Sequence, residues 1–99
     1  AIGQVDILID DGGHFVKDQK SALQLWWPHI NKGGLYIVED CHSNYYYPWW
    51  NGVEERFVES LSPWIKVVME NGMNQSGVPV ETDVEELTFR KSLVILKKR

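Results

Sequence analysis

The stretch DILIDDGGH, residues 6–14, constrains the fold of this chain more than any other part of it. Its apolar centre, Ile7-Leu8-Ile9, has the length and aliphatic character of a strand that is buried on both faces. The run stops abruptly at two aspartates, two glycines and a histidine. We expect Gly12-Gly13 to make a tight turn with positive φ, and we expect chemistry at this strand end.

The same pattern recurs further along the chain. Gly33-Gly34 precede an apolar run, residues 35–38, which stops at Glu39-Asp40. If the two strands are parallel, both acidic ends lie at the carboxyl edge of the sheet, where open α/β sheets bind ligands. Carboxylates in one crevice repel each other unless a metal ion, a protonated amine or an arginine compensates them. A divalent metal ion is the simplest of these solutions.

The segment between the two runs has the pattern of a helix. Over residues 17–30 the apolar side chains recur at helical spacing. We expect Pro28 to distort the last turn and Gly33-Gly34 to end the helix before the second strand. Strand, helix and strand within about 30 residues predict a parallel βαβ unit with a right-handed crossover.

The second half of the chain predicts one more helix and a hairpin. An amphipathic pattern over residues 53–64 indicates a helix that Pro63 perturbs or ends. Residues 67–69 form either a short strand or the buried tail of that connection, and residues 70–79 form a polar loop. Residues 84–96 predict an antiparallel hairpin whose last strand lies next to the second strand. The expected fold is α/β, with a sheet flanked by helices.

Composition limits the classes of function. A chain of 99 residues forms a single domain, 1–99, and 10 Lys and Arg against 14 Asp and Glu argue against a nucleic-acid partner. No apolar run approaches the ~20 residues of a membrane span, and no secretion signal is evident. The single Cys41 excludes an internal disulfide and predicts a cytoplasmic protein. Because the chain starts almost directly with a strand, we expect it to be a piece of something longer.

The loop CHSNYYYPWWNG, residues 41–52, is dense in aromatic residues. Loops of this kind often face ligands, which makes Tyr45, Tyr46, Trp49 and Trp50 candidate walls of a binding site. Alternatively, these rings cover the sheet edge or form a subunit contact.

Residues 5–52 resemble the carboxyl-terminal half of class I S-adenosylmethionine (SAM)-dependent methyltransferases. The combination of DILIDDGGH with WWPHINKGGLYIVEDCHSNYYYPWW carries this resemblance. The most similar subgroup is that of the metal-dependent O-methyltransferases that act on macrolide and rhamnosyl sugars. The resemblance implies a Rossmann-like half-domain and a Mg²⁺-dependent methyl transfer from SAM to a sugar or polyol hydroxyl.

The resemblance also implies roles for individual residues. Asp11, Glu39 and Asp40 correspond to the ligands of a divalent ion, most simply Mg²⁺, and His14 to the general base. Hard carboxylate oxygens suit Mg²⁺, and an imidazole can take a proton from a hydroxyl group that the metal has acidified. Asp10 is expected either to bond the following turn or to join the metal site.

The donor-binding features of the family are missing from these residues. No G-x-G motif occurs in the chain. We therefore expect that a donor-binding partner chain supplies them. The first strand also has an unpaired edge, so a homo-oligomer is the other expectation. The alternative function is that of a non-catalytic methyltransferase-like fragment, which acts as an oligomeric or interaction module. A metal-assisted hydrolase is a third reading, for which the sequence offers no nucleophile.

Overall fold

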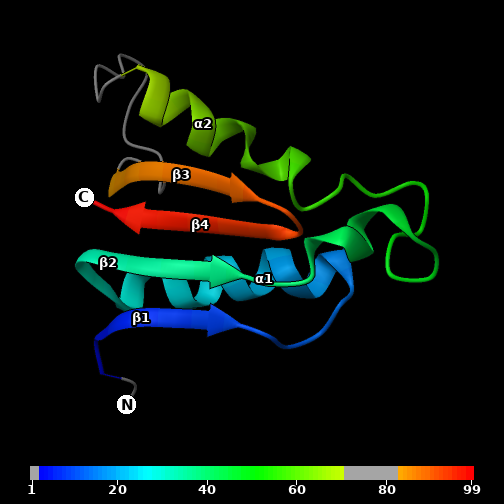
Figure 1. Ribbon diagram of the computed structural model, residues 1–99, viewed down its shortest axis with the longest axis horizontal. Helices are drawn as coiled ribbons and strands as arrows, with labels where there is room; N and C mark the ends of the chain where they lie inside the picture. Colours follow the sequence, from blue (N-terminus) through cyan, green and yellow to red (C-terminus); the bar gives the residue numbers. More distant parts are fainter. Residues whose placement is uncertain (1–2, 71–82) are drawn as a thin grey trace.

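A four-stranded sheet forms the centre of the molecule in a computed structural model that describes residues 3–70 and 83–99. Its strands are β1 (Val5–Asp10), β2 (Ile30–Val38), β3 (Val84–Arg90) and β4 (Leu93–Lys98), in the order β1-β2-β4-β3 (Figure 1). β1 and β2 are parallel, and the other neighbouring pairs are antiparallel. The predicted fold class and the position of the last strand beside the second are therefore confirmed.

The crossover helix α1 (Val16–Trp26) is shorter than the pattern predicts. A 3-10 turn, η1 (Trp27–His29), contains Pro28 in its first positions and replaces the last predicted helical turn. Proline fixes φ and has no amide proton to donate, so the regular helix ends before it. The next residue, Ile30, already begins β2.

Gly33 and Gly34 lie inside β2, so the prediction that they end the helix is wrong. Gly33 has a φ of 78°, a left-handed conformation that glycine adopts without steric cost. A Cβ atom at Gly34 would lie 2.6 Å from the carbonyl oxygen of Asp6 on β1. Glycine therefore lets the two strands approach each other where their register is irregular.

The predicted helix over residues 53–64 is also wrong. The structure has a 3-10 turn, η3 (Glu59–Leu61), followed by α2 (Ser62–Met69). Pro63 lies in the first turn of α2, where its missing amide proton costs nothing. Residues 67–69 belong to this helix and not to a strand. Most of the predicted 70–79 loop lies outside the described residues.

Both helices pack on one face of the sheet, where the hydrophobic core lies. The rings of Trp27, beside α1, and Trp64, on α2, meet edge to face at 5.2 Å. The buried side chains that the sheet contributes to this core are Tyr36, Val38, Val84, Val94 and Leu96. The two helices and the sheet thus form two layers.

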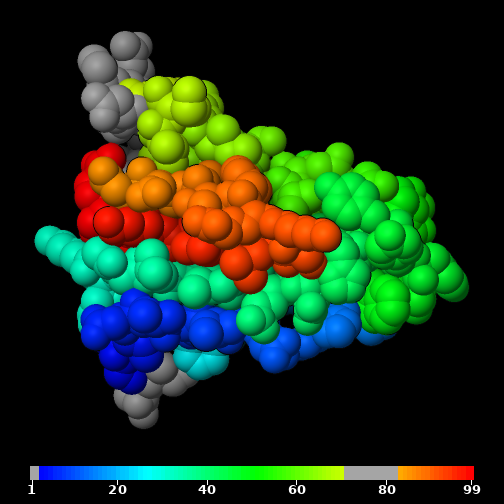
Figure 2. Space-filling model, viewed as in Figure 1, coloured from blue at the N-terminus to red at the C-terminus, as the bar shows by residue number. Residues whose placement is uncertain are grey.

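The opposite face of the sheet is open to solvent (Figure 2). Ile7 and Ile9 are 59% and 56% exposed, so the prediction that β1 is buried on both faces is wrong for this chain. Ile9 is aligned with Ile37 on β2, which is aligned with Ile95 on β4. The aliphatic character of β1 thus produces an apolar row on the uncovered face.

Candidate functional site

The acidic ends of β1 and β2 lie at the same edge of the sheet, as the sequence predicts (Figure 1). Asp10 is aligned with Val38, and the amide of Glu39 donates a hydrogen bond to the carbonyl oxygen of Asp10 at 3.2 Å. Because the two strands are parallel, Asp11 and Glu39 leave the sheet side by side.

Asp10 bonds the turn that follows β1. Its Oδ1 accepts a hydrogen bond from the amide of Gly12 at 3.1 Å, and its Oδ2 accepts one from the Tyr36 hydroxyl at 3.5 Å. Burial of Tyr36, together with the charge of Asp10, raises the pKa of the phenol well above its usual value. The turn-bonding alternative for Asp10 is therefore the one that the structure contains.

The glycine pair after β1 does not have positive φ, which corrects the prediction. A Cβ atom at Gly13 would lie 2.7 Å from Oδ2 of Asp18, on the first turn of α1. A side chain at this position would therefore displace the Asp18 carboxylate. The left-handed conformation occurs instead at Asp40, with a φ of 59°.

Asp11 and Glu39 repel each other at the sheet edge. The negative charge of Asp11 is the main reason why the pKa of Glu39 is raised, and desolvation, a hydrogen bond with Asp11 and the charge of Asp40 add to it. The raised pKa means that the neighbouring negative charges disfavour the ionised form of Glu39. A bound cation would remove this repulsion.

His14 faces Asp40. The distance from His14 Nε2 to Asp40 Oδ2 is 3.4 Å, and the two side chains are 44% and 39% exposed. Ser43 donates a hydrogen bond from its hydroxyl to the carbonyl oxygen of His14 at 2.8 Å, which ties the two loops together. The Trp49 ring lies 6.1 Å from the imidazole, at an angle of 55°.

The predicted metal ligands therefore occur in pairs, with Asp11 beside Glu39 and His14 beside Asp40. In residues 3–70 and 83–99, no three His, Cys, Asp or Glu side chains are grouped as a metal ion requires. The chemistry of the donors nevertheless suits Mg²⁺, which prefers carboxylate oxygens and keeps several water ligands.

The aromatic loop presents three of the four predicted wall residues to solvent. Tyr45, Tyr46 and Trp49 are exposed, at 57%, 58% and 37%. Trp50 is more enclosed, because the guanidinium of Arg56 lies 3.6 Å from the centre of its ring. Its Nε1 also donates a hydrogen bond to the carbonyl oxygen of Glu54 at 2.6 Å. Trp50 thus helps to hold the loop together.

Asn44 is a buried polar residue that the sequence analysis missed. It lies in the 3-10 turn η2 (Cys41–Tyr45) and is completely buried. Its Nδ2 donates a hydrogen bond to Oε1 of Gln19 on α1 at 2.9 Å, and its Oδ1 accepts one from the amide of Val58 at 3.3 Å. No local signal could have identified it, because both contacts join distant parts of the chain.

Ser92, in the turn between β3 and β4, holds the segment that follows Asp40. The amide of Cys41 donates to the carbonyl oxygen of Ser92 at 3.0 Å, and the amide of His42 donates to its Oγ at 3.1 Å. Nδ1 of His42 lies 2.7 Å from the same Oγ. The sequence alone gave Ser92 and His42 no partner.

Cys41 is not a suitable nucleophile for a metal-assisted hydrolase, the third function that the sequence left open. Burial is the main cause that raises the pKa of its thiol to about 11. Its Sγ also donates a hydrogen bond to the carbonyl oxygen of Val38 at 3.5 Å. The thiol is therefore neutral near pH 7 and enclosed by protein.

Replacement of Ser92 tests how the β3–β4 turn holds the segment that follows Asp40. We expect Ser92→Ala to lower the free energy of unfolding more than Ser92→Gly, by about 1–2 kcal/mol. Both variants lose the Oγ contacts, but only alanine is strained at the φ of 60° that Ser92 has. Urea unfolding of the two variants measures the difference. Equal stability, or a more stable alanine variant, would contradict the expectation.

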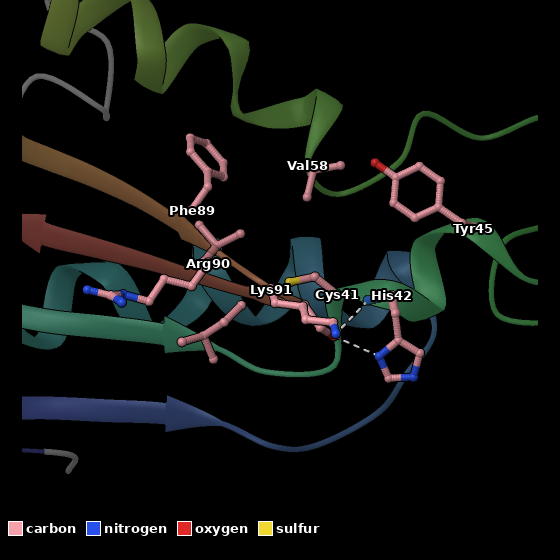
Figure 3. Close-up of a pocket in the computed structure, with 10 residues that line it drawn as sticks. Cys41, His42, Tyr45, Val58, Phe89, Arg90 and Lys91 are labelled. Atoms are coloured by element: carbon pink, nitrogen blue, oxygen red, sulfur yellow. Dashed lines mark hydrogen bonds between the residues drawn. The ribbon is translucent and has the colours of Figure 1, made fainter.

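A cavity of about 530 Å³ adjoins this turn (Figure 3). Its walls come from η2, from the segment before η3 and from the β3–β4 hairpin, and its largest aromatic side chains are Tyr45 and Phe89. A smaller cavity of about 390 Å³ lies between β1 and α1 and includes Asp11 and Trp26 in its lining. The smaller cavity is therefore the one that includes a residue of the acidic edge.

No family model matches the chain. A solved structure, the MycE methyltransferase from the mycinamycin biosynthetic pathway in complex with Mg and SAH, matches 97% of the chain with a TM-score of 0.82 and 23% identity. The chain has part of a methyltransferase fold. This methyltransferase-like segment spans 27% of the MycE chain.

Curated sequence relatives agree with this fold. The chain is 29% identical to the 8-demethyl-8-alpha-L-rhamnosyl tetracenomycin-C 2'-O-methyltransferase of Streptomyces olivaceus, over all of the chain and 28% of that protein. It is 39% identical to the demethylmacrocin O-methyltransferase of Streptomyces fradiae, over 44% of the chain and 11% of that protein. The resemblance to sugar O-methyltransferases is therefore confirmed, for a segment that spans under a third of these relatives.

Neither α1 nor α2 is long enough to cross a lipid bilayer, and residues 3–70 and 83–99 contain no other helix that could.

Proposed function

We propose that residues 1–99 form the carboxyl-terminal half of the methyltransferase-like fold in a Mg²⁺- and SAM-dependent O-methyltransferase that acts on a sugar or polyol hydroxyl. The observation that carries the proposal is that two pairs of these residues, Asp11 with Glu39 and His14 with Asp40, both lie at the carboxyl edge of a methyltransferase-like sheet. The MycE structures that share this fold contain Mg and SAH, and the named relatives methylate sugar-bearing compounds. These facts support a biosynthetic role, which we propose to be cytoplasmic.

Asp11, Glu39 and Asp40 would hold the metal ion. When bound, Mg²⁺ lowers the pKa of a hydroxyl group that it contacts, and it neutralises the repulsion that raises the pKa of Glu39. With few protein ligands, positions stay open for substrate oxygens. The residues that repel each other in the free chain thus become the binding site.

His14 is the proposed general base. Its Nε2 takes the hydroxyl proton while the oxygen attacks the methyl group of SAM, so that an O–C bond forms, an S–C bond breaks and SAH leaves. Asp40 Oδ2, at 3.4 Å from Nε2, stabilises the resulting imidazolium. Of the four aromatic residues, Trp49 has its ring 6.1 Å from the imidazole and would form a wall for the substrate. The exposed rings of Tyr45 and Tyr46 would add to this wall, and Trp50 would support the loop.

The donor requires further protein surface. Because no G-x-G motif occurs in these residues, we propose that SAM is bound mainly by a partner surface, from the same protein, a second copy or a donor-binding chain. Isothermal titration with SAM, with and without millimolar Mg²⁺, tests this proposal. We expect Mg²⁺ to strengthen SAM binding where the donor-binding surface is present. Unchanged binding would contradict a shared metal and donor site.

A second candidate function, that of an assembly module, is favoured by the uncovered sheet face. Within residues 3–70 and 83–99, β1 pairs only with β2 and forms one edge of the sheet. The row of Ile9, Ile37 and Ile95 offers apolar contacts to another chain, and the edge of β1 offers backbone groups.

Replacement of Ile9 tests self-association. We expect Ile9→Lys to lower the mass measured by light scattering at micromolar concentration, because a charge on the apolar row disfavours its burial. Leu25→Lys, on the exposed surface of α1, is the matched control and should leave the mass unchanged. A wild-type chain that is already monomeric would contradict self-association.

Replacement of Glu39 tests the metal site. For wild type we expect Mg²⁺ at a hundred times its dissociation constant to raise the free energy of unfolding by about 2.7 kcal/mol. Glu39→Gln should abolish this gain, and without Mg²⁺ it should not be less stable than wild type, because the repulsion from Asp11 is removed. Thermal melts in Mg²⁺ and in EDTA measure both effects. A Mg²⁺ gain that survives in Glu39→Gln would exclude Glu39 as a ligand.

A further inference from the structure

Ser43 forms hydrogen bonds with the main chains of both His14 and Asp40. Its amide donates to the carbonyl oxygen of Asp40 at 3.1 Å, and its hydroxyl donates to the carbonyl oxygen of His14 at 2.8 Å. The first bond joins residues three positions apart at the start of η2, and the second joins residues 29 positions apart. A single residue thus bridges the two loops that follow β1 and β2.

This bridge lies inside the protein. Ser43 is 1% exposed, so water cannot replace its hydroxyl in the bond to His14. Its neighbour Asn44 is also buried, and the bond from Asn44 to Gln19 holds η2 against α1. The hydroxyl of Ser43 therefore has a fixed position relative to α1, and so has the carbonyl group of His14 that it bonds.

His14 depends on this bond because it lies in an irregular segment between β1 and α1. Within the described part of the chain, its main chain has no hydrogen bond other than the one from Ser43. Its side chain is 44% exposed, so the surrounding packing leaves the imidazole partly free. The bond from Ser43 thus limits where Nε2 of His14 can lie.

The main chain of Asp40 is fixed on both sides. Its φ of 59° is left-handed, a conformation that is less favourable for other residues than for glycine, so neighbouring contacts must maintain it. Ser43 bonds its carbonyl oxygen, and the amide of Cys41 bonds Ser92. The 3.4 Å between Asp40 Oδ2 and His14 Nε2 already exceeds the length of a strong charged hydrogen bond. A small movement of either main chain would therefore separate the two groups.

We propose that Ser43 is a positioning residue that holds the base His14 beside Asp40 during proton transfer. The inference rests on the proposed function and adds to it a buried residue that does not touch the substrate. Ser43→Ala keeps the amide bond to Asp40 and removes only the hydroxyl that holds His14. Because misplacing a catalytic group by about 1 Å lowers a rate by up to about a hundredfold, we expect kcat to fall about ten- to hundredfold. The KM for the sugar should stay near that of wild type.

The first measurement uses the chain without metal or donor. It is the nuclear Overhauser contact between the imidazole protons of His14 and the ring protons of Trp49, whose ring centres lie 6.1 Å apart. We expect Ser43→Ala to weaken this contact at least twofold, because the imidazole becomes free to move. Ser43→Cys, whose thiol is a weaker donor of similar size, should also weaken it and serves where the alanine variant does not fold.

Ser60→Ala is the matched control. The Ser60 hydroxyl also donates to a main-chain carbonyl oxygen, that of Phe57, but it lies in η3 and bonds neither His14 nor Asp40. We expect this variant to retain the contact between His14 and Trp49, and to retain the wild-type kcat.

The second measurement gives kcat and KM with the complete donor-binding assembly, and the two measurements separate the inference from the proposed function. An unchanged contact in folded Ser43→Ala, an unchanged kcat, or a loss confined to KM overturns the positioning role, while methyl transfer by wild type leaves the proposed function standing. If the wild-type assembly transfers no methyl group, the proposed function and the role in proton transfer both fail. A contact that depends on Ser43 then supports only the structural bridge.

Discussion

Replacing His14 by Gln lowers the rate of methyl transfer by about 10²–10⁴-fold, the usual contribution of a general base. The amide of Gln keeps hydrogen-bonding capacity but cannot take the hydroxyl proton that Nε2 receives. Because the carboxylates of Asp11, Glu39 and Asp40 are unchanged, Mg²⁺ affinity should stay near that of wild type. Single-turnover assays with the complete donor-binding assembly measure the rate, and titration measures the metal affinity.

The matched control for this variant is His29→Gln. His29 lies in η1, where its ring is 6.0 Å from the ring of Trp26. It directly precedes β2, and the candidate site lies at the opposite end of that strand. We expect its transfer rate to equal that of wild type. Equal losses in both variants, or a His14→Gln enzyme with full activity, would contradict the role of His14 as the base.

Replacing Asn44 by Ala lowers the free energy of unfolding by about 2–4 kcal/mol. The reason is that one buried and one partly buried polar group lose their hydrogen-bond partner. These groups are Oε1 of Gln19, a residue that is 2% exposed, and the amide of Val58. Such a loss is a large share of the 5–15 kcal/mol that stabilises a typical domain. Urea unfolding measures it.

Asn51→Ala is the control on the same loop. Oδ1 of Asn51 accepts bonds from the amides of Val53 and Glu54 at exposed positions, where water can replace it, so the loss should be smaller. A double-mutant cycle with Gln19→Met adds a second check, because the paired loss should fall short of the sum of the single losses. Additive losses would mean that Asn44 and Gln19 do not act as a buried pair.

The ends of the first two strands and the hairpin could be predicted because local features of the sequence mark them. An apolar run that stops at Asp11, and another that stops at Glu39, mark two parallel strands with their carboxyl ends at one edge. The alternation of residues 84–96 marked the hairpin. These signals depend on neighbours in sequence, so no tertiary information was needed.

Helix boundaries were less predictable, although Pro63 contained a usable signal. Proline is favoured in the first turn of a helix, which identifies the start of α2 better than the apolar stripe over residues 53–64 does. The first part of that stripe, residues 53–58, instead belongs to a loop. Nε of Arg56 in this loop donates a hydrogen bond to the carbonyl oxygen of Asn44 at 3.1 Å. Periodicity alone cannot distinguish the two cases.

The contacts that shape the site were beyond sequence reasoning. Ser92 and His42 are 50 positions apart, and Asn44 and Gln19 are 25 apart. The burial of β1 was predicted wrongly for a related reason. An aliphatic strand has the same composition whether its second face is covered within the chain or is left open, as at Ile9.

The most direct test of the proposed metal site is a titration with Mn²⁺ followed by ¹H–¹⁵N NMR. Mn²⁺ takes the same oxygen ligands as Mg²⁺, and its unpaired electrons broaden signals of nearby amides. We predict that the amides of Gly12, His14 and Asp40 broaden first and that excess Mg²⁺ restores them. Broadening centred on other acidic residues, such as Glu85 and Glu86, or broadening that Mg²⁺ does not reverse, would contradict a magnesium site at the carboxyl edge of the sheet.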